Sequence, residues 1–401
     1  MRATSTNCRR FQRRRNNRRA GNVQCSVGIA PTIRATRGQN RARGMPTQNA
    51  KNMTSRRSIA AVTGLALAWL LAPLAPPAFA QNAYITNQGV YPNFSNNVTV
   101  IDTTTNKVVA TVEVGLAPAG VAVTPDGKRA YVTNRAVSGT VSVIDTATNA
   151  VSATIAVGSN PVGIAITPDG SKAYVANQAR HSTVSVIDTA TNSVSTTIDV
   201  GPTPFGIAVT PDGSKLYVAH DALSGTVSVI DTATNAVAAT ITVGRHPVGV
   251  AVKPDGSRVY VANKGNGNVS VIDATTNTVV ATIEVGLAPF AVAVSPDGST
   301  LYATNLNNTV SVIATANNAV SATIRVGNGP LGIAFTPDGS KAYVANQFDN
   351  TVSVIATATN TVITTVGVGS SPIAFGAFIM PPKPIVRLID SPTPANRRQH
   401  R

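Results

Sequence analysis

The sequence predicts an all-β fold, a seven-bladed β-propeller made of four-stranded antiparallel blades. Three observations predict it: a repeat of 41 to 47 residues, a composition poor in charge, and a Pro-Asp-Gly turn in six of the repeats. A repeat of this length fits one propeller blade. Charged residues are only 12% of the 401, and Val, Thr, Ala and Ser dominate, which favours many short strands.

A tetrad that starts with tyrosine marks the repeat. The first tetrad is Tyr84-Ile85-Thr86-Asn87. Six more begin at Tyr131, Tyr174, Tyr217, Tyr260, Tyr302 and Tyr343. Seven recurrences at nearly constant spacing predict seven blades.

Each repeat divides into four predicted strands, named A to D from the channel outward. In the third repeat, strand A at 163–166 runs into the turn Pro168-Asp169-Gly170, where proline presets φ and glycine accepts positive φ. Strand B follows at 172–177. Strand C at 183–188 alternates apolar and polar residues, as a half-buried strand does. Strand D occupies 193–200.

The two ends of the repeat region predict how the ring closes. The chain reaches strand B at Tyr84 without a preceding strand A, and a lone A-type segment follows the seventh repeat at 372–378. We therefore expect 373–378 to supply the innermost strand of the first blade. Closure of this kind removes two exposed sheet edges.

These features resemble the YVTN family of β-propeller repeat proteins. The resemblance rests on the tyrosine tetrads, the Val-Ser-Val-Ile-Asp strands and the six Pro-Asp-Gly turns, and it covers about residues 84 to 378. It implies an exported bacterial or archaeal propeller, sometimes at the cell surface. The shared motifs build blades, so the resemblance specifies the fold and not an activity.

The net charge of +16 is confined to the ends of the chain. Residues 1–57 hold 15 of the 33 Lys and Arg, and no acidic residue precedes Asp102. Residues 81–379 hold 13 basic and 16 acidic residues, a net charge of −3. Because nucleic-acid affinity rests on phosphate neutralisation, we expect no nucleic-acid partner.

The N-terminal region predicts export. Residues 53–80 combine Arg56 and Arg57, a short apolar run and Ala78-Phe79-Ala80, the pattern of a signal peptide cleaved after Ala80. We therefore expect a periplasmic, extracellular or cell-surface protein without stable membrane insertion. A retained anchor and twin-arginine export are the alternatives.

Two flanking segments lack hydrophobic periodicity. Residues 1–52 are rich in Arg and Asn and are expected to be disordered, or not translated if the true start is Met53 or Met45. Residues 380–401 form a Pro-rich basic tail, typical of a linker. We expect residues 81–379 to form the propeller, as a monomer.

No motif for catalysis or metal binding is present. Both cysteines, Cys8 and Cys25, precede the signal peptide, and no His-x-x-His, Gly-x-Ser-x-Gly or Walker pattern occurs. Strand A offers almost only Gly, Ala, Val, Ile and Phe. We therefore expect a protein that is not an enzyme and carries no cofactor or metal.

The loops that differ between repeats predict a binding face. Loops B–C and D–A vary, and because strands alternate in direction they emerge on one face of the ring. Its exposed candidates are Tyr91, Phe94, Arg180, His181, Arg245, His246 and Phe348. The leading hypothesis is a binding or scaffold protein acting through this face on a protein, glycan or envelope ligand. The alternatives are a lactonase-like or cofactor-bearing propeller enzyme and a nucleic-acid-binding protein.

Overall fold

A computed structural model describes residues 81–136, 138–179 and 181–381. The predicted disordered segment, the predicted signal peptide, residues 382–401 of the predicted tail and Arg180 lie outside these residues. Among the described residues, no helix is long and apolar enough to cross a membrane.

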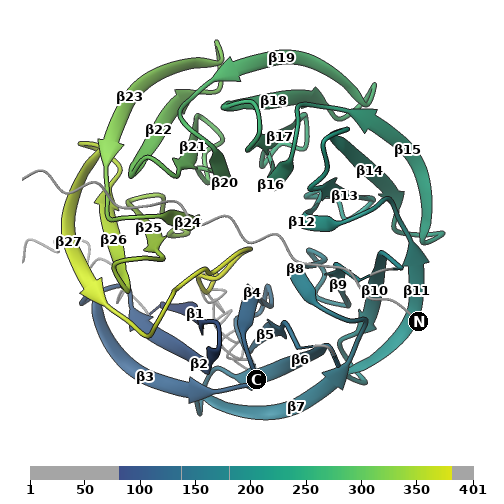
Figure 1. Ribbon diagram of the computed structural model, residues 1–401, viewed down its shortest axis with the longest axis vertical. Helices are drawn as coiled ribbons and strands as arrows, with labels where there is room; N and C mark the ends of the chain where they lie inside the picture. The colour runs from purple at the N-terminus through teal and green to yellow at the C-terminus, as the bar shows by residue number, and fades with distance from the viewer. Residues whose placement is uncertain (1–80, 137, 180, 382–401) are drawn as a thin grey trace, which may run out of the picture. The chain divides into compact units, whose positions relative to one another are not determined.

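Seven antiparallel sheets are arranged around a central channel, as the sequence predicted (Figure 1). Six sheets have four strands, and the first has three. The strands, blade by blade, are β1 (Asn82–Val90), β2 (Asn93–Asp102), β3 (Lys107–Glu113); β4 (Pro118–Val123), β5 (Arg129–Asn134), β6 (Thr140–Asp145), β7 (Ala150–Ala156); β8 (Pro161–Ile166), β9 (Lys172–Asn177), β10 (Thr183–Asp188), β11 (Ser193–Asp199); β12 (Pro204–Val209), β13 (Lys215–His220), β14 (Thr226–Asp231), β15 (Ala236–Thr242); β16 (Pro247–Val252), β17 (Arg258–Asn263), β18 (Asn268–Asp273), β19 (Thr278–Glu284); β20 (Pro289–Val294), β21 (Thr300–Asn305), β22 (Thr309–Ala314), β23 (Ala319–Arg325); β24 (Pro330–Phe335), β25 (Lys341–Asn346), β26 (Thr351–Ala356) and β27 (Thr361–Gly367).

Burial decreases from the middle of each blade to its rim. The second and third strands of a blade are almost wholly buried, since both of their faces pack against neighbouring blades. The outermost strand exposes most of its residues, which explains its many Thr and Ala. Apolar side chains therefore fill the space between blades, and this is the core of the propeller.

Two tight turns recur in the blades. In the A-to-B turn, the Asp169 carboxylate accepts hydrogen bonds from the Thr167 hydroxyl at 2.5 Å and from the Ser171 backbone N–H at 3.0 Å. Gly170 takes φ of 73°, which a side chain would strain. In the C-to-D turn, Asp145 accepts from the backbone N–H of Thr148 at 2.9 Å. Both aspartates hold turns, as Asx turns do.

The tetrad asparagine joins strands B and C. The Asn134 side-chain amide donates to the hydroxyls of Thr140 and Ser142, both at 3.0 Å. The asparagine is fully buried, and its amide reaches across to strand C because that strand carries hydroxyls at matching positions.

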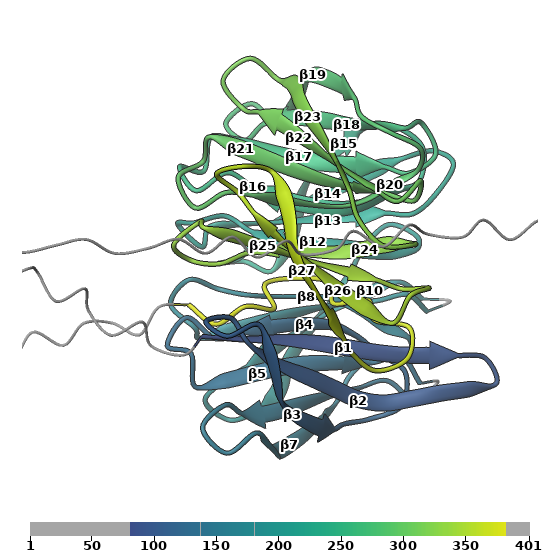
Figure 2. The ribbon, with the colours of Figure 1, turned by 90° about the vertical axis from the view of Figure 1, so that its left-hand side faces the viewer.

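The C-terminal segment lies along the inner edge of the first blade (Figures 1 and 2). Ile373 N–H donates to Thr86 O at 3.0 Å, and Tyr84 N–H donates to Phe378 O at 2.8 Å. The segment makes three isolated bridges and no continuous ladder. Ala374 and Gly376 have positive φ, which interrupts an extended strand.

Candidate functional site

One residue follows each tetrad, and the seven together surround one end of the channel; we call them the post-tetrad ring. Each is partly buried. Each donates its backbone N–H to the carbonyl of a D-to-A loop residue whose φ is positive, as Asp221 does to Thr203 at 2.9 Å. The ring consists of Gln88, Arg135, Gln178, Asp221, Lys264, Leu306 and Gln347. Six of these seven side chains are polar.

A charged cluster occupies one side of the ring. Asp221 Oδ1 lies 2.7 Å from His246 Nδ1, and Asp221 Oδ2 lies 3.1 Å from Lys264 Nζ. A carboxylate only accepts, so His246 donates through Nδ1 and its Nε2 is left as the basic nitrogen. Within the described part of the chain, no protein atom forms a hydrogen bond with this Nε2. The His246 side chain is 36% exposed, so solvent reaches it.

Local backbone geometry positions His246. It has φ of 50° in the loop between β15 and β16, and its N–H donates to Ala222 O at 2.8 Å. Its own carbonyl accepts the N–H of Lys264 at 3.0 Å. The loop therefore ties the imidazole to strand ends of two neighbouring blades, so Asp221, His246 and Lys264 are held by backbone bonds as well as by side chains.

A second cation lies elsewhere in the ring. Arg135 donates to Asn160 Oδ1 at 3.0 Å and reaches Gln178 Oε1 at 3.5 Å. None of the ion pairs among the described residues includes it. Burial lowers the pKa of the Arg135 guanidinium. The ordinary pKa of arginine is so high that the group stays charged at neutral pH. A partly buried, unpaired guanidinium is a ready partner for an anion.

An apolar plug forms the floor beneath the ring. Phe205, Phe290 and Phe375 meet with ring centroids 5.2 to 5.7 Å apart. The Lys264 ammonium lies 5.7 Å from the centre of the Phe290 ring. Leu306 of the ring packs against the same group of side chains. Charged groups and an apolar surface therefore adjoin at this end of the channel.

A buried serine–histidine pair has a structural role. His220 Nε2 lies 2.8 Å from Ser228 Oγ, and Nδ1 lies 3.1 Å from Pro202 O. Both side chains are buried, and no carboxylate of the described residues hydrogen-bonds to the imidazole. His220 thus bonds the same strand C position that the asparagine reaches in other blades. Burial lowers the pKa of His220, so the neutral form is favoured.

The structure separates the predicted binding-face candidates into groups. Tyr91, Phe94 and Phe348 line one depression of about 380 Å³, together with Arg135. His246 lies in the charged cluster. Arg245 and His181 are exposed, and neither contacts that cluster through a hydrogen bond or ion pair. The position of Arg180 is outside the described residues.

Sequence reasoning missed Asp221, Lys264 and Arg135 as members of one site. The search for a catalytic centre considered strand A, whereas the polar groups come from the position after strand B. A signal was present in the sequence, because this position varies among Gln, Arg, Asp, Lys and Leu directly after an almost constant tetrad. Among the described residues, no group of three His, Cys, Asp or Glu side chains is arranged to hold a metal ion.

Comparisons with known proteins agree on the fold. The lactonase family, described as a seven-bladed β-propeller, matches residues 183–368. The chain is a seven-bladed β-propeller. The YVTN resemblance has no such match to support it, and no curated protein matches the chain significantly.

Three solved structures are similar to this chain. Hydrazine synthase from Kuenenia stuttgartiensis is 27% identical, with a TM-score of 0.62 over 69% of this chain and 92% of that one. A protein of unknown function from Desulfotomaculum acetoxidans is 19% identical, with a TM-score of 0.62 over 74% and 100%. A proposed 6-phosphogluconolactonase from Bacteroides fragilis is 18% identical, with a TM-score of 0.63 over 74% and 98%.

The prediction that the propeller is not an enzyme is wrong. The match to the lactonase family points to a hydrolase, and a propeller named for the same activity shares the fold. The prediction failed because it considered only the innermost strands. In this propeller the polar side chains that converge on the channel come from the post-tetrad ring and from His246 in a loop.

Proposed function

We propose that this propeller hydrolyses a lactone at the post-tetrad ring, with His246 as general base. The observation that carries the proposal is the contact between His246 Nδ1 and Asp221 at 2.7 Å, which leaves Nε2 of a partly exposed imidazole as the basic nitrogen. The similarity of residues 183–368 to the lactonase family supports it, because this range includes Asp221, His246 and Lys264.

The residues of the charged cluster have distinct roles in this reaction. A water molecule gives a proton to His246 Nε2 while the water oxygen forms a bond to the carbonyl carbon of the lactone. Asp221 fixes the tautomer and stabilises the imidazolium that results. The ester C–O bond of the lactone then breaks, and the leaving oxygen takes the proton from His246. One lactone and one water give one hydroxy acid, so the reaction needs no cofactor.

Lys264 supplies positive charge next to the reacting carbonyl. Its ammonium lies 3.1 Å from Asp221 Oδ2 and 5.7 Å from the centre of the Phe290 ring, and this apolar neighbour strengthens its electrostatic effect. A fixed cation stabilises the negative charge that develops on the carbonyl oxygen. The phenylalanine plug beneath favours a substrate whose lactone ring or substituent is apolar.

The experiment compares the full-length protein with His246→Gln and His181→Gln on a panel of lactones, with acid release followed by pH-stat titration. His181 is the matched control because it is an exposed histidine outside the cluster. We expect His246→Gln to lower kcat/KM by about 100-fold or more, the typical effect of losing a general base. His181→Gln should stay within about twofold of the wild type. The proposal would be wrong if the wild type hydrolysed no lactone of the panel, or if His246→Gln kept the kcat/KM of the wild type.

A second candidate function is binding through the variable-loop face. Tyr91 is 81% exposed and Phe348 is 73% exposed, and both border the depression that contains Arg135. Strands β1 and β2 are longer than their counterparts; Tyr91 lies in the turn between them, and Phe94 belongs to β2. Exposed aromatic side chains rimmed by polar groups are typical of a protein or glycan site. Glycan-array binding by the wild type, lost in Tyr91→Ala with Phe348→Ala, would support this function; no binding would exclude a glycan.

A further inference from the structure

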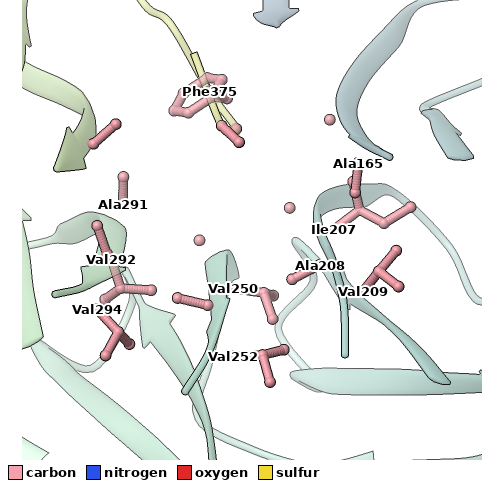
Figure 3. A pocket seen from close by; sticks show the side chains of 18 of the residues that line it. Ala165, Ile207, Ala208, Val209, Val250, Val252, Ala291, Val292, Val294 and Phe375 are labelled. Atoms are coloured by element: carbon pink, nitrogen blue, oxygen red, sulfur yellow. The ribbon is translucent and has the colours of Figure 1, made fainter. Parts of the chain in front are cut away.

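A second cavity lies inside the ring, on the other side of the phenylalanine plug from the charged cluster. Its volume is about 410 Å³. Its side-chain lining is apolar, apart from Thr210 (Figure 3). The volume falls in the range of about 300–1,000 Å³ that is common for small-molecule sites.

The exposure of the lining shows which end is closed. Val162 and Val248, in the layer of the plug, are fully buried. Further along the same inner strands, Ile166, Val209 and Val252 are partly exposed. Pro168, Pro211 and Pro296 of the Pro-Asp-Gly turns also line the cavity and are themselves exposed. The cavity is therefore a cup that opens on the turn face of the ring, opposite the variable loops.

Aspartates stand in three of the turns at the rim of this cup. Each of the three lining prolines is followed directly by an aspartate, namely Asp169, Asp212 and Asp297. The ion pairs found among the described residues include none of the three.

These carboxylates are charged under ordinary conditions. The Thr167 hydroxyl lowers the pKa of Asp169 to about 2, and the Thr210 hydroxyl does the same for Asp212. The Ser295 hydroxyl lowers the pKa of Asp297 to about 2. Three negative charges therefore lie at neutral pH in the turns whose prolines line the entrance.

We propose that the cup binds a cationic amphiphile, an apolar chain that carries an ammonium head. The chain occupies the apolar cavity, because a dry apolar lining favours apolar atoms over water. The head stays at the rim among the three aspartates, where opposite charge and access to water coincide. An anionic amphiphile such as a fatty acid would place a carboxylate among carboxylates and is disfavoured. The site is independent of lactone hydrolysis, since the plug separates the two.

Three probes with the same chain and different heads test the proposal on the full-length protein by isothermal titration calorimetry. They are decyltrimethylammonium, decanol and decyl sulfate, each below its micellar range. We expect one equivalent of decyltrimethylammonium to bind about tenfold or more tightly than decanol at low ionic strength, with decyl sulfate weakest. Salt should reduce the preference for the cation.

Substitutions separate the two parts of the site. Val252→Phe with Val294→Phe fills the cup from partly exposed positions, and should weaken binding of both the cation and decanol by about tenfold or more. Val280→Phe is the matched control, because Val280 is exposed on the outer strand β19. Asp169→Asn, Asp212→Asn and Asp297→Asn together should remove the preference for the cation and leave decanol binding unchanged.

Each outcome decides the proposal. Saturable binding in the order cation, alcohol, sulfate supports it even if the phenylalanine variant does not fold. Absence of saturable binding of the cation, equal affinity for all three heads, or binding that the triple asparagine variant leaves unchanged would overturn it. Thermal melts of each variant identify those that do not fold.

Discussion

The Tyr343 hydroxyl lies 2.5 Å from Asn106 Oδ1, joining the last blade to the first. The same contact links neighbouring blades elsewhere, as from Tyr131 to Asn192 at 2.7 Å. The tyrosine rings are fully buried between blades, and their hydroxyls reach the C-to-D turn of the next blade rather than open solvent. In the Tyr343 pair this contact spans 237 positions of sequence and closes the ring.

Tyr343→Phe should lower the free energy of unfolding by about 1 kcal/mol, the typical net contribution of one hydrogen bond. Tyr260→Phe is the matched control. Tyr260 is equally buried, but no hydrogen bond from its hydroxyl is present among the described residues. Urea unfolding of both variants measures the difference. Equal losses in the two would show that the Tyr343 contact contributes nothing of its own.

Removal of the C-terminal segment should destabilise the ring. Ile373 and Phe378 are 2% and 0% exposed, and each fully buried side chain contributes about 1.5–3 kcal/mol. A chain that ends at Ser371 should melt at a clearly lower temperature and associate, because it exposes the inner edge of the first blade. A chain that ends at Pro381 should do neither. Calorimetry with light scattering tests both, and a shorter chain that melts normally as a monomer contradicts the closure.

His220 should make stability depend on pH. Burial lowers its pKa in the folded state below the unfolded value near 6.5, so the unfolded chain binds the proton first. Stability therefore falls as the pH drops below about 6.5. His220→Asn restores the side chain found in the other tetrads and should remove this loss, whereas His181→Asn should keep it. Urea unfolding at pH 7 and at pH 5 measures the free energy of unfolding of the wild type and of both variants. If this free energy changed equally with pH in all three proteins, His220 would not be the cause of the pH dependence.

Asp212 should contribute to acid stability. Its folded pKa is lowered to about 2 by the Thr210 hydroxyl, by the Ser214 backbone N–H and by the Ser214 hydroxyl. The stabilisation is thus complete above the unfolded pKa near 4 and disappears as the pH falls toward 2. Asp212→Asn should reduce stability at pH 6 and have little effect at pH 2. Asp199→Asn, on the exposed end of β11, is the control. Its effect on the free energy of unfolding should be similar at pH 6 and at pH 2.

Much of the fold could be predicted from the sequence because each blade is defined by local signals. The tetrad at Tyr174, the turn at Asp169 and the alternation at 183–188 act within one repeat, and hydrophobic periodicity specifies strands without knowledge of the neighbours. Even the unmatched ends of the repeat could be noticed in the sequence. The irregular backbone of the last segment could not, since positive φ at Ala374 has no local signature.

The candidate site depended on the tertiary structure. Asp221, His246 and Lys264 are separated by up to 43 positions, and each belongs to a different strand end or loop. Only the curvature of the ring brings these positions to one end of the channel, where a carboxylate contacts an imidazole and an ammonium. The sequence by itself determined the blades, because a blade is stabilised by contacts within and between repeats that every repeat carries. The structure decided which non-repeated residues meet, because side chains that interrupt the pattern are brought together by closure of the ring and not by their order in the chain.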